Sequence, residues 1–178
     1  MIMPKNYAKF TFEDLRQLGL TTVLARLFPV EIPQSISPST WLKDSLSRNE
    51  GLSLNTEKAK SEFIIAPVLN ELRQHNKAVF AVYSGYNFMV DAQRGLQGFC
   101  DFLLAKLPLS IIPETPIIAV VEAKLKQDLS AAVPQCAAEM YATQLWNQQR
   151  NEPLAVVYGV ITTVTYGCFC VLKGSKLP

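Results

Sequence analysis

A glutamate and a lysine stand two residues apart at the end of a long apolar segment. Residues 117–121 are all apolar, and Glu122-Ala123-Lys124 follows them. Such a segment is typical of a strand buried on both faces, and strand alternation places Glu122 and Lys124 on the same face. Ionised groups at the end of a buried strand are costly unless they are paired or bind a metal. The triplet therefore indicates either a mutual salt bridge at a strand end or a site with chemistry.

A second carboxylate lies inside another apolar segment, residues 98–104, where Asp101 stands between Cys100 and Phe102. Aspartate is disfavoured in strands, so Asp101 either bonds to a turn or backbone amide or has a function. If the two strands are neighbours, Asp101 and Glu122 come close together and each raises the pKa of the other. A divalent cation would relieve that repulsion, and oxygen ligands suit Mg²⁺ or Mn²⁺ better than zinc.

Two helices carry further polar candidates. Residues 56–74 have helical periodicity, with Pro67 expected to kink the helix. A step of about 100° per residue places Glu62 on the apolar side, toward the sheet, and Glu71 opposite. That apolar side consists of Ile65, Leu69 and Leu72. The alternative for Glu62 is an acid favoured by the helix dipole. In the second helix, residues 131–147, Gln135 shares a side with Ala138, Ala142 and Leu145, and the alternative is an exposed glutamine.

The elements that position these side chains follow one another in a simple order. The N-terminal part predicts a helix capped by Thr11 and a second helix that begins at Ser37-Pro38 and ends at Arg48. Strands are expected at 79–83, 87–90, 99–104 and 117–124, and a hairpin at 156–163 and 166–172. The fold class is therefore α/β, a mixed sheet flanked by helices. We expect a single domain over residues 1–178, with an N-terminal helical elaboration (1–50) and an α/β core (56–173).

Composition excludes several classes of protein. The chain has 178 residues, of which 49% are hydrophobic and 18% charged, with a net charge of +2. No apolar stretch approaches the roughly 18 residues of a membrane span, so we expect a soluble cytoplasmic protein. The four cysteines form no CxxC pair and there is one histidine, which disfavours a zinc site. Cys168 and Cys170 are expected to be reduced strand residues that face the same way.

The chain resembles the PD-(D/E)XK nuclease superfamily in the order of these residues. They are Glu62 on a helix, Asp101 on a strand, Glu122-Ala123-Lys124 on the next strand and Gln135 at a helix start. Two departures are Cys100 in place of the proline of the motif, and Glu139 in place of the tyrosine that follows the glutamine in the RecB-like branch. The resemblance covers residues 56–172.

The resemblance implies a restriction-endonuclease-like fold and Mg²⁺-dependent hydrolysis of phosphodiester bonds, with Mn²⁺ as a substitute metal. It implies that Asp101, Glu122, Glu62 and the backbone carbonyl of Ala123 hold the metal. Lys124 would orient the attacking water or stabilise the transition state, and Gln135 would position the nucleotide backbone.

The expected partner is nucleic acid, DNA rather than RNA, with Arg94 either a phosphate contact or a solvated loop cation. Two other hypotheses stay open. One is a catalytically silent module with the nuclease fold that binds nucleic acid or protein. The other is an interaction domain that self-associates, for example as a homodimer, through the apolar residues 20–30.

Overall fold

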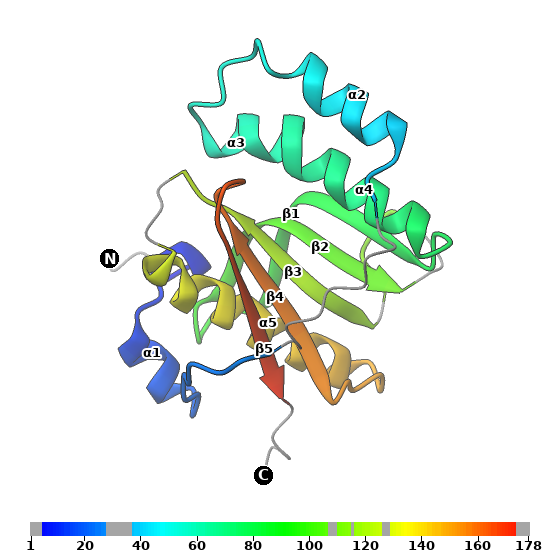
Figure 1. Ribbon diagram of the computed structural model, residues 1–178. Coiled ribbons are helices and arrows are strands. Elements are labelled where there is room, and N and C mark those ends of the chain that lie inside the picture. The colour runs from blue at the N-terminus through cyan, green and yellow to red at the C-terminus, as the bar shows by residue number, and fades with distance from the viewer. Residues whose placement is uncertain (1–4, 28–36, 107–109, 115, 126–128, 174–178) are drawn as a thin grey trace.

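The chain forms a five-stranded sheet with helices on both faces (Figure 1). The structure is a computed structural model that describes residues 5–27, 37–106, 110–114, 116–125 and 129–173. Its elements, in chain order, are η1 (Tyr7–Lys9), α1 (Phe12–Gln17), α2 (Thr40–Arg48), α3 (Glu57–Lys60), η2 (Ser61–Ile65), α4 (Ala66–His75), β1 (Phe80–Asp91), β2 (Leu96–Lys106), β3 (Ile117–Ala123), η3 (Ser130–Ala132), α5 (Val133–Gln149), β4 (Val156–Thr162) and β5 (Gly167–Lys173).

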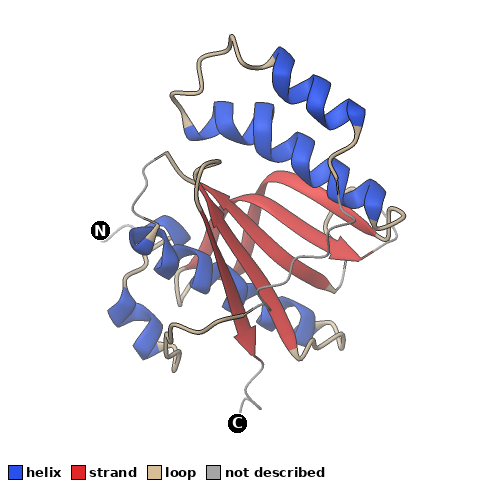
Figure 2. Cartoon of the chain, viewed as in Figure 1, coloured by secondary structure: helices blue, strands red, loops and turns tan. Residues whose placement is uncertain are grey.

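The sheet is mixed, with strand order β1-β2-β3-β4-β5. All neighbours are antiparallel except β3 and β4, which are parallel and are joined through α5. A parallel pair needs a crossover of a dozen or more residues, and α5 supplies it across one face of the sheet (Figure 2). The predicted α/β class and the predicted mixed sheet with flanking helices are confirmed.

The first strand differs from the prediction. We expected two strands, residues 79–83 and 87–90. The structure has one strand of 12 residues, β1, in which Ser84 pairs with Phe102 and Tyr86 with Cys100. Gly85 has a φ of 61°, a backbone conformation that glycine adopts at little cost. The irregularity therefore bends the strand without ending it, since both flanking residues keep their partners on β2.

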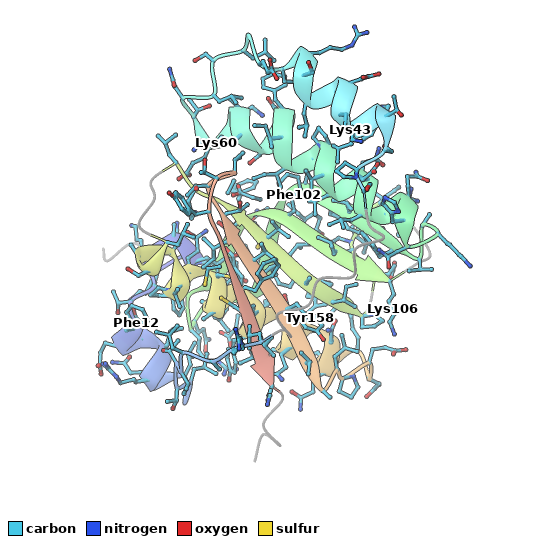
Figure 3. All side chains as sticks on the ribbon, in the orientation of Figure 1. Phe12, Lys43, Lys60, Phe102, Lys106 and Tyr158 are labelled. Carbon is cyan, nitrogen blue, oxygen red and sulfur yellow. The ribbon has the colours of Figure 1, made fainter. Side chains whose placement is uncertain are left out.

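Each face of the sheet has its own hydrophobic core. On the α5 side, Leu103, Val120 and Ile161 pack with Ala138 and with apolar residues of the N-terminal segment such as Tyr7 and Leu15. On the α4 side, Ile65 and Leu69 pack against strand residues that include Phe102, labelled in Figure 3. The end of β3 and the middle of β2, which carry the predicted site, thus lie between two packed layers.

The helix predicted for residues 56–74 is interrupted. It divides into α3, a single π turn (η2) and α4. Pro67 has no N–H and its ring collides with the carbonyl four residues earlier, which is that of Phe63. That carbonyl accepts a hydrogen bond from Asn49 Nδ2 at 2.6 Å. The wider turn therefore lies just before Pro67, rather than a kink at Pro67 itself.

The buried side of α4 is also rotated from the prediction. Glu71 is buried and Leu72 is exposed, the reverse of what periodicity indicated. The reason is a contact with the start of α2. Glu71 accepts hydrogen bonds from the Ser39 N–H at 2.7 Å and from the Ser39 hydroxyl at 2.8 Å. Ser39, and not Ser37, is the N-cap of α2, so the predicted start at Ser37-Pro38 is wrong by two residues.

No helix in the described part of the chain is long and apolar enough to cross a membrane. The apolar residues 20–30 that we considered for self-association lie only partly within the described ranges. Val23 and Leu24 are exposed, whereas residues 28–30 lie outside the described residues.

Candidate active site

Glu122 is the centre of a polar cluster at the end of β3. Its side chain is 1% exposed. Its Oε2 accepts hydrogen bonds from Lys124 Nζ at 3.0 Å and from Gln135 Nε2 at 2.7 Å, and its Oε1 accepts the Asp101 N–H at 3.4 Å. The salt bridge that we considered for Glu122 and Lys124 is therefore present, as one contact of a larger cluster.

Asp101 joins the cluster from the neighbouring strand. Phe102 pairs with Val121 in the β2–β3 ladder, so the next position places Asp101 beside Glu122. Asp101 Oδ2 accepts the Ala123 N–H at 2.8 Å, which is the backbone-amide bond that we considered as one alternative for this residue. Its other carboxylate oxygen makes no hydrogen bond to any group in the described ranges. Burial, above all, raises the pKa of Asp101, and the Ala123 hydrogen bond opposes that shift.

Lys124 is held by both backbone and side chain. Its N–H donates to the Thr162 carbonyl on β4 at 2.8 Å, which extends the pairing of β3 past its last residue. Its ammonium reaches Gln135 Oε1 at 3.2 Å as well as Glu122. Burial works against the charge, but the nearby carboxylates outweigh it, and the net effect raises the pKa of Lys124. Lys124 is therefore a fixed cation at neutral pH.

A further acid, Glu139, lies one turn after Gln135 on α5. It is fully buried, and its Oε1 accepts a hydrogen bond from Gln135 Nε2 at 3.0 Å. Burial, followed by the proximity of Glu122, raises the pKa of Glu139 well above its ordinary value. No described group donates to Glu139 Oε2, so an ionised Glu139 would be unsatisfied. A protonated Glu139 would instead donate to the Glu122 carboxylate, so that the two carboxyl groups would share one proton.

Burial is also the main reason that the pKa of Glu122 is raised, with repulsion from Asp101 adding to it. The hydrogen bond from Glu139 and the Lys124 ammonium oppose that shift. Glu139 was missed in the sequence, where it counted only as a departure from the family pattern. Its spacing of four residues from Gln135, one turn along the same helix face, was the available signal.

The helix acid that reaches the cluster is Glu57 and not Glu62. Glu57 Oε1 accepts the Leu125 N–H at 3.2 Å, and its charge raises the pKa values of both Asp101 and Lys124. The prediction that Glu62 points toward the sheet is wrong, because its side chain is 50% exposed and pairs with Lys58. A π turn advances each residue by less than 100°, and Glu62 lies within that turn. Extrapolation from Ile65 therefore misplaces it.

Lys60 ties the same helix to the strand ends. Its ammonium donates to the carbonyls of Leu125 and Thr163, each at 3.2 Å, and Figure 3 shows Lys60 between α3 and the upper ends of the strands. Figure 1 shows the same junction, where the β4–β5 turn approaches α3. Segments far apart in the chain thus converge beside Glu57 and Lys124.

The donor set has the chemistry of a magnesium site. Within the described ranges no group of three or more His, Cys, Asp or Glu side chains is arranged to hold a metal ion. Mg²⁺ needs fewer, because it usually keeps several waters and binds through one or two carboxylates together with substrate phosphates. Asp101 and Glu122 offer two carboxylates on adjacent strands, and one oxygen of Asp101 makes no hydrogen bond within the described part of the chain. The residues present fit such an ion.

Arg94 lies apart from this cluster, in the β1–β2 turn. Its Nε donates to Asp91 Oδ2 at 2.6 Å and its Nη1 to the Tyr141 hydroxyl at 3.5 Å. Asp91 Oδ1 also accepts the Arg94 N–H at 3.0 Å. Asp91 therefore stabilises the β1–β2 turn, and Arg94 is paired with it.

Comparison with known proteins adds no assignment. No family model, no curated protein and no solved structure matches the chain.

Proposed function

We propose that the chain is a metal-dependent nuclease with a restriction-endonuclease-like fold that hydrolyses phosphodiester bonds, in DNA rather than RNA. The observation that carries the proposal is the convergence of Asp101, Glu122, Lys124 and Gln135 in one hydrogen-bonded cluster. These four residues carry the resemblance to the PD-(D/E)XK superfamily. The mixed sheet, with β3 and β4 parallel and joined through α5, supports the same fold.

Each residue of the cluster would have its own role in hydrolysis. Asp101, Glu122 and the carbonyl of Ala123 would hold Mg²⁺, with Glu57 in the position of the helix acid in place of Glu62. When bound, the ion would polarise the scissile phosphate and lower the pKa of a bound water. The ammonium of Lys124, fixed by Glu122 and Gln135, would orient that water and stabilise the negative charge that develops on the phosphate.

Protonated Glu139 limits the charge of the cluster. With Asp101, Glu57 and Glu122 ionised, a fourth ionised carboxylate would add repulsion that burial makes expensive. A neutral Glu139 instead donates to Glu122 and accepts from Gln135, and so orients both side chains. Glu139 is in this view a positioning residue.

The alternative is a catalytically silent module of the same fold, which would bind nucleic acid or protein. The observation that favours it is the internal pairing of the cluster, since Glu122 Oε2 already accepts from both Lys124 and Gln135. A structural network needs nothing further, whereas a metal site must give up one of these bonds to the ion.

Calorimetric titration with Mn²⁺ and cleavage of DNA in Mg²⁺ separate the two proposals. A nuclease should bind Mn²⁺ in a manner that Asp101→Asn weakens, and Glu122→Gln or Lys124→Ala should abolish cleavage. Asp91→Asn is the matched control, because Asp91 serves the β1–β2 turn. Cleavage retained in both Glu122→Gln and Lys124→Ala would refute the assignment. Absence of Mn²⁺ binding in the unaltered protein would favour the silent module.

A further inference from the structure

Three of the four cysteines gather between α5 and the β4–β5 hairpin. Cys136 is in the first turn of α5 and is fully buried, whereas Cys168 and Cys170 are partly exposed on β5. β5 is an edge strand of the sheet, so both of its thiols lie near solvent. Cys100 is buried separately on β2. All four are free thiols, as the sequence predicted for Cys168 and Cys170.

Gly159 brings the thiols of Cys136 and Cys170 together. Gly159 stands opposite Cys170 in the β4–β5 ladder. A β-carbon added to Gly159 would lie 2.7 Å from Cys136 Sγ and 2.5 Å from Met140 Sδ. Opposed residues of an antiparallel pair have β-carbons about 4.5–5.5 Å apart. The Cys136 sulfur therefore lies in the space above this pair, near Cys170.

The surroundings divide the two thiols into a reactive one and a buried one. The neighbouring thiols of Cys136 and Cys168 lower the pKa of Cys170 to about 7, against the effect of burial. The same contact with Cys170, together with burial, raises the pKa of Cys136. A partly exposed thiolate beside a second thiol is the arrangement in which cysteines react reversibly with peroxides.

We propose that Cys170 and Cys136 form a peroxide-sensitive dithiol. The Cys170 thiolate attacks one oxygen of a hydroperoxide and the O–O bond breaks. Cys170 becomes a sulfenic acid, and the other oxygen leaves as water or alcohol after it takes up a proton. The Cys136 sulfur then attacks the Cys170 sulfur, the S–S bond forms, and the sulfenic oxygen leaves as water with the proton of Cys136. Two electrons pass from the two thiols to the peroxide. This reaction is independent of the proposed nuclease activity.

Cys136, rather than Cys168, is the partner because of strand geometry. Cys168 and Cys170 are two residues apart on β5, which separates their α-carbons by about 6.4–6.8 Å. That distance is at the upper limit for a disulfide, whose usual value is about 5.5–6 Å. Cys168 Sγ instead donates to the Phe169 carbonyl at 3.9 Å.

Intact-mass measurement of the whole protein under non-reducing conditions tests this proposal. Addition of hydrogen peroxide should remove about 2 Da, the mass of two hydrogens lost in a disulfide. Peptide mapping should then link Cys136 to Cys170. In Cys136→Ala the mass loss should disappear, and a sulfenic acid on Cys170 should instead be trapped by a 1,3-diketone. Cys100→Ala is the matched control and should still form the bridge.

Three results would overturn the proposal. One is unaltered protein that shows neither the mass loss nor a trapped sulfenic acid. Another is a map that links Cys168 to Cys170. The last is a bridge found only between two molecules, seen as a dimer on a non-reducing gel. Because the mass and the peptide map are read on the unaltered protein, the proposal stays testable even if Cys136→Ala fails to fold.

Discussion

The raised pKa of Glu139 predicts that the stability of the protein depends on pH. Glu139 is fully buried with its pKa raised well above the ordinary value of 4.5. Above that value the unfolded chain releases the proton, whereas the folded chain keeps it. The unfolded state then binds fewer protons, so the free energy of unfolding falls as pH rises. The fall continues until the pH passes the raised pKa of the folded protein.

Glu139→Gln should remove this dependence. Glutamine has nearly the shape of a protonated glutamate, so it can accept from Gln135 and donate to Glu122 without titrating. One proton corresponds to about 1.4 kcal/mol per pH unit. The stability of the variant relative to the unaltered protein should therefore rise by about 1.4 kcal/mol for each pH unit above the ordinary pKa, as far as the raised pKa extends.

Urea unfolding, followed by tryptophan fluorescence from about pH 5 to about pH 8, measures this difference. Asp14→Asn is the control, because hydrogen bonds from Lys5 and Thr11 lower the pKa of Asp14 to about 2. The contribution of Asp14 is complete above the ordinary pKa and is lost only as pH falls through the lowered one, so its difference should be flat in this range. Parallel curves for Glu139→Gln and the unaltered protein would refute the shared proton.

Three further substitutions test the geometry. Glu57→Gln should weaken Mn²⁺ binding and Mg²⁺-dependent cleavage, while Glu62→Gln on the same helix should leave both unchanged; equal effects of the two in calorimetry and cleavage would contradict the assignment of the helix acid. The fully buried amide of Asn147 bonds to both the N–H and the carbonyl of Ile117, at 2.8 Å and 2.7 Å. Asn147→Leu should lower the free energy of unfolding by about 2–6 kcal/mol, because each of these two buried backbone groups costs about 1–3 kcal/mol when it is left unpaired. Gln148→Leu, at an exposed position, is the control in urea unfolding. Gly159→Ala should cost about 1–3 kcal/mol by the same measurement, since its methyl group would collide with the sulfur atoms of α5, and an unchanged midpoint would contradict the close packing.

Strand alternation and apolar runs were enough to predict the central part of the cluster. Glu122 and Lys124 share a face because side chains two residues apart along a strand always do, and β3 is a strand as its apolar composition indicated. Asp101 was expected near Glu122 because sequential strands are usually neighbours, and β2 and β3 are indeed paired. These are local rules, so a single sequence carries them.

The helix acids depended on tertiary structure. Which of Glu57 and Glu62 reaches the strand ends was decided by the π turn before Pro67, and that turn accompanies the contact between Asn49 and Phe63. Likewise, Glu71 is buried because Ser39, far away in the chain, offers it two hydrogen bonds. Helical periodicity assumes an uninterrupted helix and an apolar partner, and neither assumption holds for residues 56–75.

The sequence by itself therefore determined which residue types could do chemistry and which of them share a strand face. Tertiary structure alone decided that Glu139 lies beside Glu122 and that Cys136 lies near Cys170. Both pairs join α5 to a strand, and their contacts depend on how closely the helix approaches the sheet. Gly159 allows that approach, because the absence of a side chain there leaves room for the sulfur atoms of α5. A glycine in a strand does not predict which residue will occupy the space beside it.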